Sequence, residues 1–382
     1  MSTVRAVPTI APRRATSTTL PEPPPLRQRF DTALARFLNH RADELGTIEN
    51  QTPDTPASGL TEAMTLIRRF VLADGKRLRP LFCYWGWRAA APERELDPAA
   101  EEAVISAAAA LELFHSFALI HDDLMDASDL RRGEPTLHRA FTGVPPLRGA
   151  AADRERLAAS LAILAGDLCA MWSDQMFEEA GADPGRVAAA RRWLALMRSE
   201  VMVGQYLDLT VASGSLPLAE QVIRYKTARY TVTRPLQIGA ALAGAAADLL
   251  DGFERFGDPL GAAFQLRDDL LGVFGQPEQT GKSIVDDLRE GKPTVLIGLA
   301  LARADTAQTR TITTLYGRAD LGERGAQRLR AAIAATGAPE AVEALIEQRC
   351  ARALAVLDDL PIDPNARDAL RALATAAVSR RR

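Results

Sequence analysis

The segment HDDLMDASDLRRG, residues 121–133, follows an apolar run with helical spacing and says more about the fold and chemistry than any other part of the chain. Residues four apart share one face of a helix, so Asp122 and Asp126 point together whereas Asp123 points elsewhere. Two converging carboxylates suit Mg²⁺, which prefers oxygen ligands and is often held by carboxylates together with substrate phosphates. The forked guanidinium groups of Arg131 and Arg132 match phosphate oxygens. Taken alone, the segment also fits a solvated helix end followed by a charged turn.

A second acidic cluster weakens that alternative. The segment FQLRDDLLG, residues 264–272, again sets an aspartate pair in an apolar helical run, and it is followed by Gly281-Lys282 and by DDLREGK at 286–292. Carboxylates within apolar helices are costly unless they are paired or bind a metal, so two such clusters indicate one shared cation site. The carboxylates, arginines and apolar helices together favour a metal-bridged phosphate ester with an apolar tail.

The composition favours helices. Of the 382 residues, 47% are hydrophobic but only 5% are aromatic, and many runs are rich in alanine. We therefore expect an all-α, single-domain antiparallel helix bundle around a central cavity, with the two aspartate clusters on facing helices. The net charge of −3 provides no basic field for nucleic acid, so no nucleic-acid partner is expected.

Apolar periodicity predicts helices over much of the chain. The expected helical ranges are 30–45, 60–72, 99–122, 154–180, 184–209, 218–226, 235–249, 259–271, 294–302, 322–335 and 339–357. Glycine and proline in segments 143–146 and 214–217 predict loops there.

The first 26 residues differ from the rest and are predicted to form a disordered tail, followed by one domain over residues 27–382. The tail contains PEPPP at 21–25 and little apolar periodicity. Its arginines and the absence of an acid before Glu22 also fit an organelle transit peptide, although no sustained amphipathic helix is present.

The cysteines and the apolar runs bear on location. Cys83, Cys169 and Cys350 lie far apart without metal-like spacing, as reduced thiols of a cytosolic protein would. No charge-free apolar stretch is long enough to span a bilayer, so we expect a cytoplasmic protein without stable membrane insertion.

From about Leu60 onward the chain resembles the trans-isoprenyl diphosphate synthases of the polyprenyl synthetase family. The first aspartate-rich motif of that family resembles residues 122–126, the second resembles the segment from Asp268, and a third motif resembles GKRLRP at residues 75–80. The resemblance implies a magnesium-dependent prenyltransferase of isoprenoid biosynthesis that condenses an allylic diphosphate with isopentenyl diphosphate. It also implies a homodimer.

The resemblance assigns roles residue by residue. Isopentenyl diphosphate would be bound by Lys76, Arg79, His115 and Arg132. The allylic diphosphate would be contacted by Arg131, Lys226, Thr227, Gln265 and Lys282, and magnesium would be held by Asp122, Asp126 and Asp268. Among these residues Lys226, Thr227 and Gln265 are the catalytic candidates, because their dipoles would lie beside the allylic carbocation.

One position departs from the family pattern. The second motif usually carries a third aspartate, and Gly272 stands at that place. Because residue 272 would share a helix face with Asp268, one carboxylate is missing there. Two hypotheses follow from the missing carboxylate: the chain binds the metal more weakly, or it is a subunit that needs a partner.

Product length is expected to depend on the helix before the first motif, where one turn of about 5.4 Å corresponds roughly to one isoprene unit. Phe117 and Ala118 lie five and four residues before Asp122, and Phe114 lies one turn deeper. A small Ala118 with an aromatic Phe117 resembles geranylgeranyl diphosphate synthases and favours a C20 product. Phe114 and Phe117 could also be ordinary core residues.

Other functions remain as alternatives. A farnesyl or a longer (C25 and above) product would keep the enzyme class. A class I terpene cyclase would not need the second diphosphate site of Lys76, Arg79 and Arg132, and a non-catalytic regulatory subunit would typically have lost first-motif carboxylates. The segment GQYLD at 204–208 is expected to support the same cavity, and His121 to support Asp122.

Overall fold

The computed structural model describes residues 24–49, 59–91, 98–144, 151–210, 215–275 and 284–378. Elements before α6 are α1 (Pro24–Glu49), α2 (Leu60–Leu72), α3 (Leu78–Ala90), α4 (Pro98–Met125), β1 (Leu130–Arg131), β2 (Glu134–Pro135), α5 (Leu137–Ala140) and η2 (Phe141–Gly143). The middle contains α6 (Ala151–Glu178), α7 (Pro184–Thr210), α8 (Leu216–Val222), the π-helix η3 (Ile223–Thr233), α9 (Arg234–Leu242) and α10 (Ala247–Phe274). The last elements are α12 (Ile284–Glu290), α13 (Val295–Arg303), α14 (Thr306–Leu315), α15 (Glu323–Ala335), α16 (Ala338–Asp359) and α17 (Pro364–Val378).

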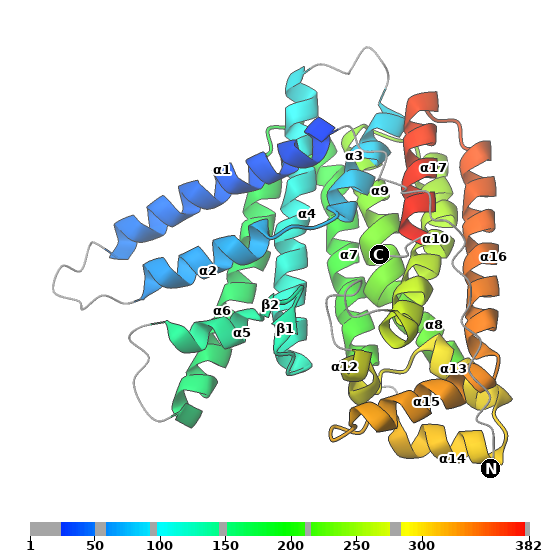
Figure 1. Ribbon diagram of the computed structural model, residues 1–382. Coiled ribbons are helices and arrows are strands. Elements are labelled where there is room, and N and C mark those ends of the chain that lie inside the picture. The colour runs from blue at the N-terminus through cyan, green and yellow to red at the C-terminus, as the bar shows by residue number, and fades with distance from the viewer. Residues whose placement is uncertain are drawn as a thin grey trace.

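The long helices run side by side and form one bundle. In Figure 1, α4, α7, α10, α16 and α17 stand upright, α1 and α2 cross the outer side of α4, and α12 to α15 lie across the lower end. The strands form one short antiparallel hairpin beside the lower half of α4, in which Leu130 pairs with Pro135. The all-α prediction is confirmed.

Helix α4 is the central element of the core. Its run of small residues, Ala107 to Ala110, is fully buried, and α4 packs closely against α6. Small side chains allow this approach, while larger ones such as Leu111 fill the remaining space. The carboxyl-terminal end of α4 carries the first aspartate cluster, so the best-packed helix of the core also positions the site.

Most predicted helices exist, with changed bounds. The range 60–72 is confirmed as α2, but the predicted helix over 235–249 is wrong, because α9 ends at Leu242 and α10 begins at Ala247. Gly244 has a φ of 77°, which favours glycine and lets the chain turn between the two helices. Helix α1 begins at Pro24, so the last three residues of the predicted tail are helical, and Leu26 is buried. Residues 1–23 lie outside the described residues.

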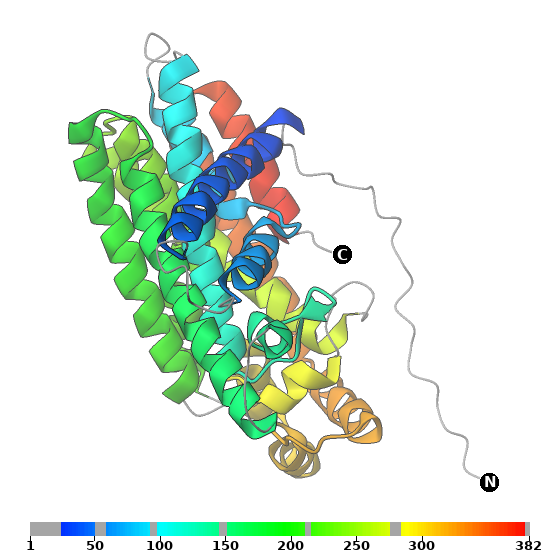
Figure 2. The ribbon, with the colours of Figure 1, turned by 90° about the vertical axis from the view of Figure 1, so that its left-hand side faces the viewer.

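Two helices are long and apolar enough to cross a membrane by length and composition alone, Pro98–Met125 and Asp153–Glu178. The apolar window of the first is 72% buried inside the fold, as expected of a core helix. That of the second is only 39% buried. Exposed apolar side chains on α6 and α7 lie on one face, here called the α6–α7 face: Leu157, Ile163, Leu164, Met171, Leu196, Met202, Val203, Tyr206 and Leu209. These two helices lie along the left-hand side of Figure 2.

Candidate active site

The first aspartate pair lies at the lower end of α4, and a lysine contacts each carboxylate. Lys226 Nζ donates to Asp122 Oδ1 at 3.0 Å, and Lys292 Nζ donates to Asp126 Oδ2 at 2.9 Å. Burial favours the neutral form of Asp122, but Lys226 and Lys292 outweigh it and lower its pKa. Asp122 is therefore ionised, and each carboxylate of the pair lies beside a positive charge.

The GQYLD segment of α7 completes this cluster, as predicted for a supporting shell. Gln205 Nε2 donates to Asp122 Oδ1 at 3.2 Å, and Asp208 Oδ2 accepts from Lys226 at 2.5 Å. Burial lowers the pKa of Lys226, but Asp122 and Asp208 more than compensate and raise it, so the ammonium stays charged. Tyr206 of the same segment points outward and is 66% exposed.

The π-helix η3 is held very close to its two neighbours. A Cβ atom at Gly204 of α7 would lie 2.3 Å from the backbone nitrogen of Lys226, and one at Gly261 of α10 would lie 2.4 Å from Cα of Ala228. Glycine is therefore required at both positions for the backbones to approach. π-Helical turns are frequent at functional sites. Here the approach fixes Lys226 and Thr227 between α7 and α10.

Thr227 and Gln265, two of the residues to which the family resemblance gives a catalytic role, contact each other. Thr227 Oγ1 donates to Gln265 Oε1 at 2.6 Å, and Gln265 Nε2 donates to Asp269 Oδ1 at 2.7 Å. Burial raises the pKa of Asp269 to about 7 despite the Gln265 hydrogen bond, and the charges of Asp268, Asp287 and Asp208 act in the same direction. Asp269 is thus a buried carboxyl group with other carboxylates close by.

The donor chemistry of the two clusters fits a divalent cation. Both clusters offer carboxylate oxygens, the ligands that Mg²⁺ prefers. In the described part of the chain, no three histidine, cysteine, aspartate or glutamate side chains are grouped closely enough to hold a metal. Lys226 and Lys292 occupy positions beside Asp122 and Asp126 instead. Asp122, Asp126 and Asp268 remain the residues that would hold the cation.

Arg131 connects the acidic cluster to an adjoining pocket. It binds the buried Asp123, its Nη2 lies 3.7 Å from Asp122 Oδ2, and its side chain lines a cavity of about 280 Å³. Asp123 points away from Asp122 and Asp126, as the helical spacing predicts. Its function as the anchor of Arg131 was missed, although the alternation of the three aspartates could have suggested it.

Polar and apolar side chains both line the pocket. His115, Arg131 and Arg132 are among the polar ones, and Leu66 and Phe70 of α2 are among the apolar ones. Burial and the charges of the nearby arginines hold the pKa of His115 well below its ordinary value, so the imidazole is neutral. Burial and the charge of Arg131 also lower the pKa of Arg132. Four arginines, two of them Arg131 and Arg132, line the pocket against three acidic residues, so the lining has a net positive charge, which fits an anion.

The GKRLRP motif divides its arginines between two tasks. Arg77, with a φ of 49°, binds Asp31 at 2.8 Å and the buried Glu112 at 3.0 Å, which ties α1 to α4. Arg79 turns towards η3, where its guanidinium stacks on the Tyr230 ring at 4.1 Å and donates to Thr231 at 2.9 Å.

The ring of Tyr230 also joins the predicted diphosphate residues. His115 Nδ1 and the Tyr230 hydroxyl are 3.2 Å apart, and Arg132 lies beside Gly75 and donates to the carbonyl of Asp74. The structure therefore brings Arg79, His115 and Arg132 to one region. Lys76 belongs to the same loop, whereas Lys282 lies outside the described residues.

The three residues predicted to set product length lie on α4 above the aspartates. The rings of Phe114 and Phe117 are 5.2 Å apart, and Phe114 also contacts Tyr230 at 6.0 Å. Arg198 of α7 stacks on Phe114 at 5.1 Å while it binds Asp174 at 2.6 Å. Ala118 is half-buried beside this group.

His121 does not support Asp122, so that expectation is wrong. Its Nε2 lies 3.1 Å from the carbonyl of Ile163, and its ring stacks on Phe117 at 4.7 Å. A Cβ atom at Gly166 would lie 2.2 Å from that nitrogen, so the glycine of α6 provides the space. Lys292, which lies within DDLREGK and has no predicted role, contacts Asp126.

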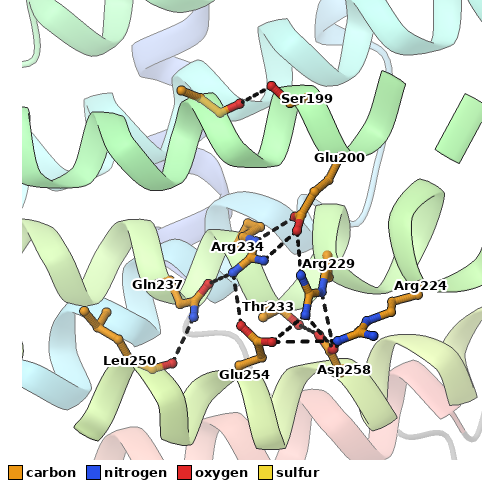
Figure 3. Close-up of polar contacts among 11 residues, drawn as sticks. Ser199, Glu200, Arg224, Arg229, Thr233, Arg234, Gln237, Leu250, Glu254 and Asp258 are labelled. Carbon is orange, nitrogen blue, oxygen red and sulfur yellow. Dashed lines mark hydrogen bonds and ion pairs between the residues drawn. The ribbon is translucent and has the colours of Figure 1, made fainter. Parts of the chain in front are cut away.

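A buried network of charges anchors η3 from behind. Glu200 of α7 accepts from Arg229 at 2.6 Å and from Arg234 at 2.7 Å, and Thr233 donates to Asp258 of α10 at 2.8 Å (Figure 3). Arg234 is 1% exposed, and Arg229 also contacts Glu254. Burial raises the pKa of Glu200, but the two arginines lower it by more. The net pKa is therefore lowered, and the carboxylate is ionised. Three helices, α7, α9 and α10, thus converge on η3, the element that carries Lys226.

Comparisons with known proteins agree with this geometry. The family model of the polyprenyl synthetases matches residues 61–333. The chain is 31% identical over 317 residues to a geranylfarnesyl diphosphate synthase of Aeropyrum pernix, covering 81% of this chain and 92% of that protein. It is 32% identical over 318 residues to the octaprenyl diphosphate synthase of Escherichia coli, covering 82% and 88%.

The solved structure of a geranylgeranyl pyrophosphate synthase from Corynebacterium glutamicum, complexed with isoprenyl diphosphate and magnesium, has a similar fold. Its TM-score is 0.86 at 39% identity, and the match covers 94% of this chain and 99% of that chain. Fold and site thus define an all-α prenyltransferase that uses allylic diphosphates and isopentenyl diphosphate. The chain belongs to the polyprenyl synthetase family.

Proposed function

We propose that this prenyltransferase condenses allylic diphosphates with isopentenyl diphosphate, in the presence of Mg²⁺, to give geranylgeranyl diphosphate. The observation that carries the proposal is the position of Arg131, which lies between the Asp122 carboxylate and the cationic pocket. An ionising diphosphate and a second diphosphate can then be held side by side. A cyclase, which ionises a single substrate, has no use for the second cationic pocket.

Asp122, Asp126 and Asp268 would hold magnesium, which neutralises the allylic diphosphate and makes it a better leaving group. The resemblance to a magnesium-containing structure supports this assignment, as does the grouping of several carboxylates around Asp269. Lys226 and Lys292 would move from the carboxylates towards phosphate oxygens once the substrate is bound. Their charged state in the described structure is consistent with that task.

The residues of η3 and α10 act on the allylic carbon. The Thr227 hydroxyl, which directly follows Lys226 in the chain, donates to the Gln265 amide. The partial negative charge on Gln265 Oε1 would stabilise the allylic carbocation. Because Asp269 accepts from Gln265 Nε2, the amide cannot flip, and its oxygen faces Thr227. The buried η3 backbone also keeps water away from the cation.

Isopentenyl diphosphate would bind through Lys76, Arg79, His115 and Arg132. The apolar side chains of Leu66 and Phe70 suit its short hydrocarbon part, while the cationic side chains of the pocket suit the diphosphate. The double bond then attacks the allylic carbon, and the proton is lost to the departing diphosphate. Holding both reactants in register would supply much of the rate.

The C20 product is proposed from α4. Phe117 and Ala118 leave room past the first turn, and Phe114, covered by Arg198, would end the tunnel one turn deeper. The relatives make products of several lengths, including geranylfarnesyl and octaprenyl diphosphate, so the product of this chain depends on these residues.

We propose that the protein is a cytoplasmic homodimer. The α6–α7 face exposes several apolar side chains, among them Leu164 and Met171 on α6 and Tyr206 on α7. Exposed apolar surface of this kind marks an interaction site, and a second copy would bury the same face on both subunits.

Product analysis tests the proposal. Purified protein is incubated with Mg²⁺, labelled isopentenyl diphosphate and, separately, dimethylallyl, geranyl and farnesyl diphosphate. A C20 product is expected with each primer, and Asp122→Ala should lower turnover by orders of magnitude while the helical circular dichroism is unchanged. Another chain length would overturn the assignment of α4, and no elongation or a cyclic hydrocarbon would overturn the function.

A further inference from the structure

The second aspartate cluster contains a gap that another element fills. Gly272 lies one turn after Asp268 on α10, on the same face of the helix. A Cβ atom at Gly272 would lie 2.2 Å from Asp287 Oδ2 and 3.2 Å from its carboxyl carbon. The carboxylate of Asp287 therefore occupies the space in which a side chain at position 272 would begin.

Helix α12 holds Asp287 firmly against α10. Leu288 is fully buried and Val285 is 8% exposed, so the helix packs into the core on both sides of Asp287. The carbonyl of Leu288 accepts from Gly317 N at 3.0 Å, and Arg289 Nε donates to the carbonyl of Leu321 at 3.0 Å. These contacts fix the direction of the helix, which lies beside the lower part of α10 in Figure 1.

The same segment reaches the first aspartate cluster. Lys292, which follows α12, contacts Glu290 and Asp126, each at 2.9 Å. Asp287 is also one of the carboxylates whose charge raises the pKa of Asp269. Residues 287–292 thus extend between the two clusters, with Asp287 at the end beside Gly272.

We propose that Asp287 supplies the carboxylate that position 272 lacks, so that α10 and α12 together form the second half of the cation site. This inference rests on the proposed function, because it adds a residue to the same magnesium site. A carboxylate from a second helix can substitute for one on the first, because the cation requires oxygen atoms at suitable distances and not a particular chain position. Gly272 is then required, since a larger residue would displace Asp287.

Metal binding tests this inference separately from turnover. Mn²⁺ binding in the presence of inorganic diphosphate is measured by electron paramagnetic resonance for the wild type, Asp287→Asn and Asp268→Asn. Asp320→Asn serves as the matched control, since Asp320 is 72% exposed in its side chain and pairs only with Arg318 among the contacts described. Asp287→Asn should weaken Mn²⁺ binding roughly tenfold or more, with unchanged circular dichroism. Wild-type affinity in Asp287→Asn would overturn the inference.

A relocated carboxylate provides the second test. Gly272→Asp alone should weaken metal binding, because its side chain and that of Asp287 would compete for one space. The double variant Gly272→Asp/Asp287→Gly should recover binding to within about threefold of the wild type. A folded double variant that binds as poorly as Asp287→Asn would overturn the claim of equivalence.

The failure of the proposed function gives a different pattern. If Asp268→Asn binds Mn²⁺ like the wild type, the cation site itself is wrong, and the proposed function and this inference fall together. If Asp268→Asn binds weakly and Asp287→Asn binds normally, only this inference falls. If the double variant does not fold, the Asp287→Asn measurement decides the question.

Discussion

Asp123 binds Arg131 through both of its carboxylate oxygens: Arg131 Nε lies 2.8 and 2.9 Å from them, and Nη2 lies 2.6 Å from Oδ1. Asp123 is 1% exposed. Burial lowers the pKa of Arg131, but Asp123 and the other aspartates of the cluster raise it by more, so the net pKa is raised. The acid that faces away from Asp122 and Asp126 therefore fixes the arginine that, under the proposed function, would face the diphosphates.

Replacing Asp123 should weaken substrate binding and, because its ion pair with Arg131 is buried, should also lower the free energy of unfolding. Asp123→Asn keeps the size of the side chain but loses the negative charge and one acceptor oxygen. Arg131 can then no longer donate to two oxygens of residue 123. We expect the KM for the allylic diphosphate to rise roughly tenfold, which corresponds to about 1.4 kcal/mol. Steady-state kinetics at saturating isopentenyl diphosphate would measure it. Unchanged KM values, equal to those of Asp320→Asn, would contradict the role of Asp123.

Helical spacing explains how much of this site could be predicted. The convergence of Asp122 and Asp126, the divergence of Asp123 and the placement of Gln205 and Asp208 near them all follow from which residues share a helix face. These contacts depend on local geometry and on a bundle in which acidic helices face each other. The resemblance to the family added the residues that lie far apart in sequence, such as Thr227 and Gln265.

Other features depend on tertiary contacts that leave no local pattern. Nothing in the composition of residues 223–233 distinguishes a π-helix from an α-helix, so the turn of Arg79 towards Tyr230 could not be foreseen. Helix α3 was missed because Pro80 and Gly86 interrupt its pattern. Gly86 is explained only by α9, since a Cβ atom there would lie 2.3 Å from the carbonyl oxygen of Leu236. The arginine network behind η3 likewise requires four helices to meet.

That network predicts a large loss of stability when its central acid is removed. Glu200→Gln leaves Arg229 and Arg234 buried without their shared carboxylate, and breaking such a pair costs about 3 kcal/mol or more. The free energy of unfolding, measured with urea, should fall by that amount. Glu254→Gln is the matched control, because Glu254 is 36% exposed in its side chain and its loss should cost about 1 kcal/mol or less. Equal losses in both variants would contradict the central position of Glu200.

The neutral state of His115 predicts how stability changes with pH. Its pKa in the folded chain is well below the unfolded value near 6.5, so below that pH only the unfolded chain takes up the proton. The contribution is fully present above about pH 7 and is lost as the pH falls. Between pH 7.5 and 5.5, the wild type should lose about 1 kcal/mol more than His115→Gln in urea unfolding. His40→Gln, at an exposed position, should follow the wild type.

Product length provides the most direct test of the floor on α4. Phe114→Ala should lengthen the product, because it removes the ring that lies under Arg198 and opens roughly one more turn of about 5.4 Å. Ala118→Phe should shorten the product, because a ring placed four residues before Asp122 would block the tunnel near the carboxylates. Chromatography of the dephosphorylated products would measure both changes. Phe82→Ala removes a fully buried ring from α3 and should lower stability without altering the product, which separates loss of packing from loss of the floor. An unaltered product profile in both α4 variants would show that another helix ends the tunnel.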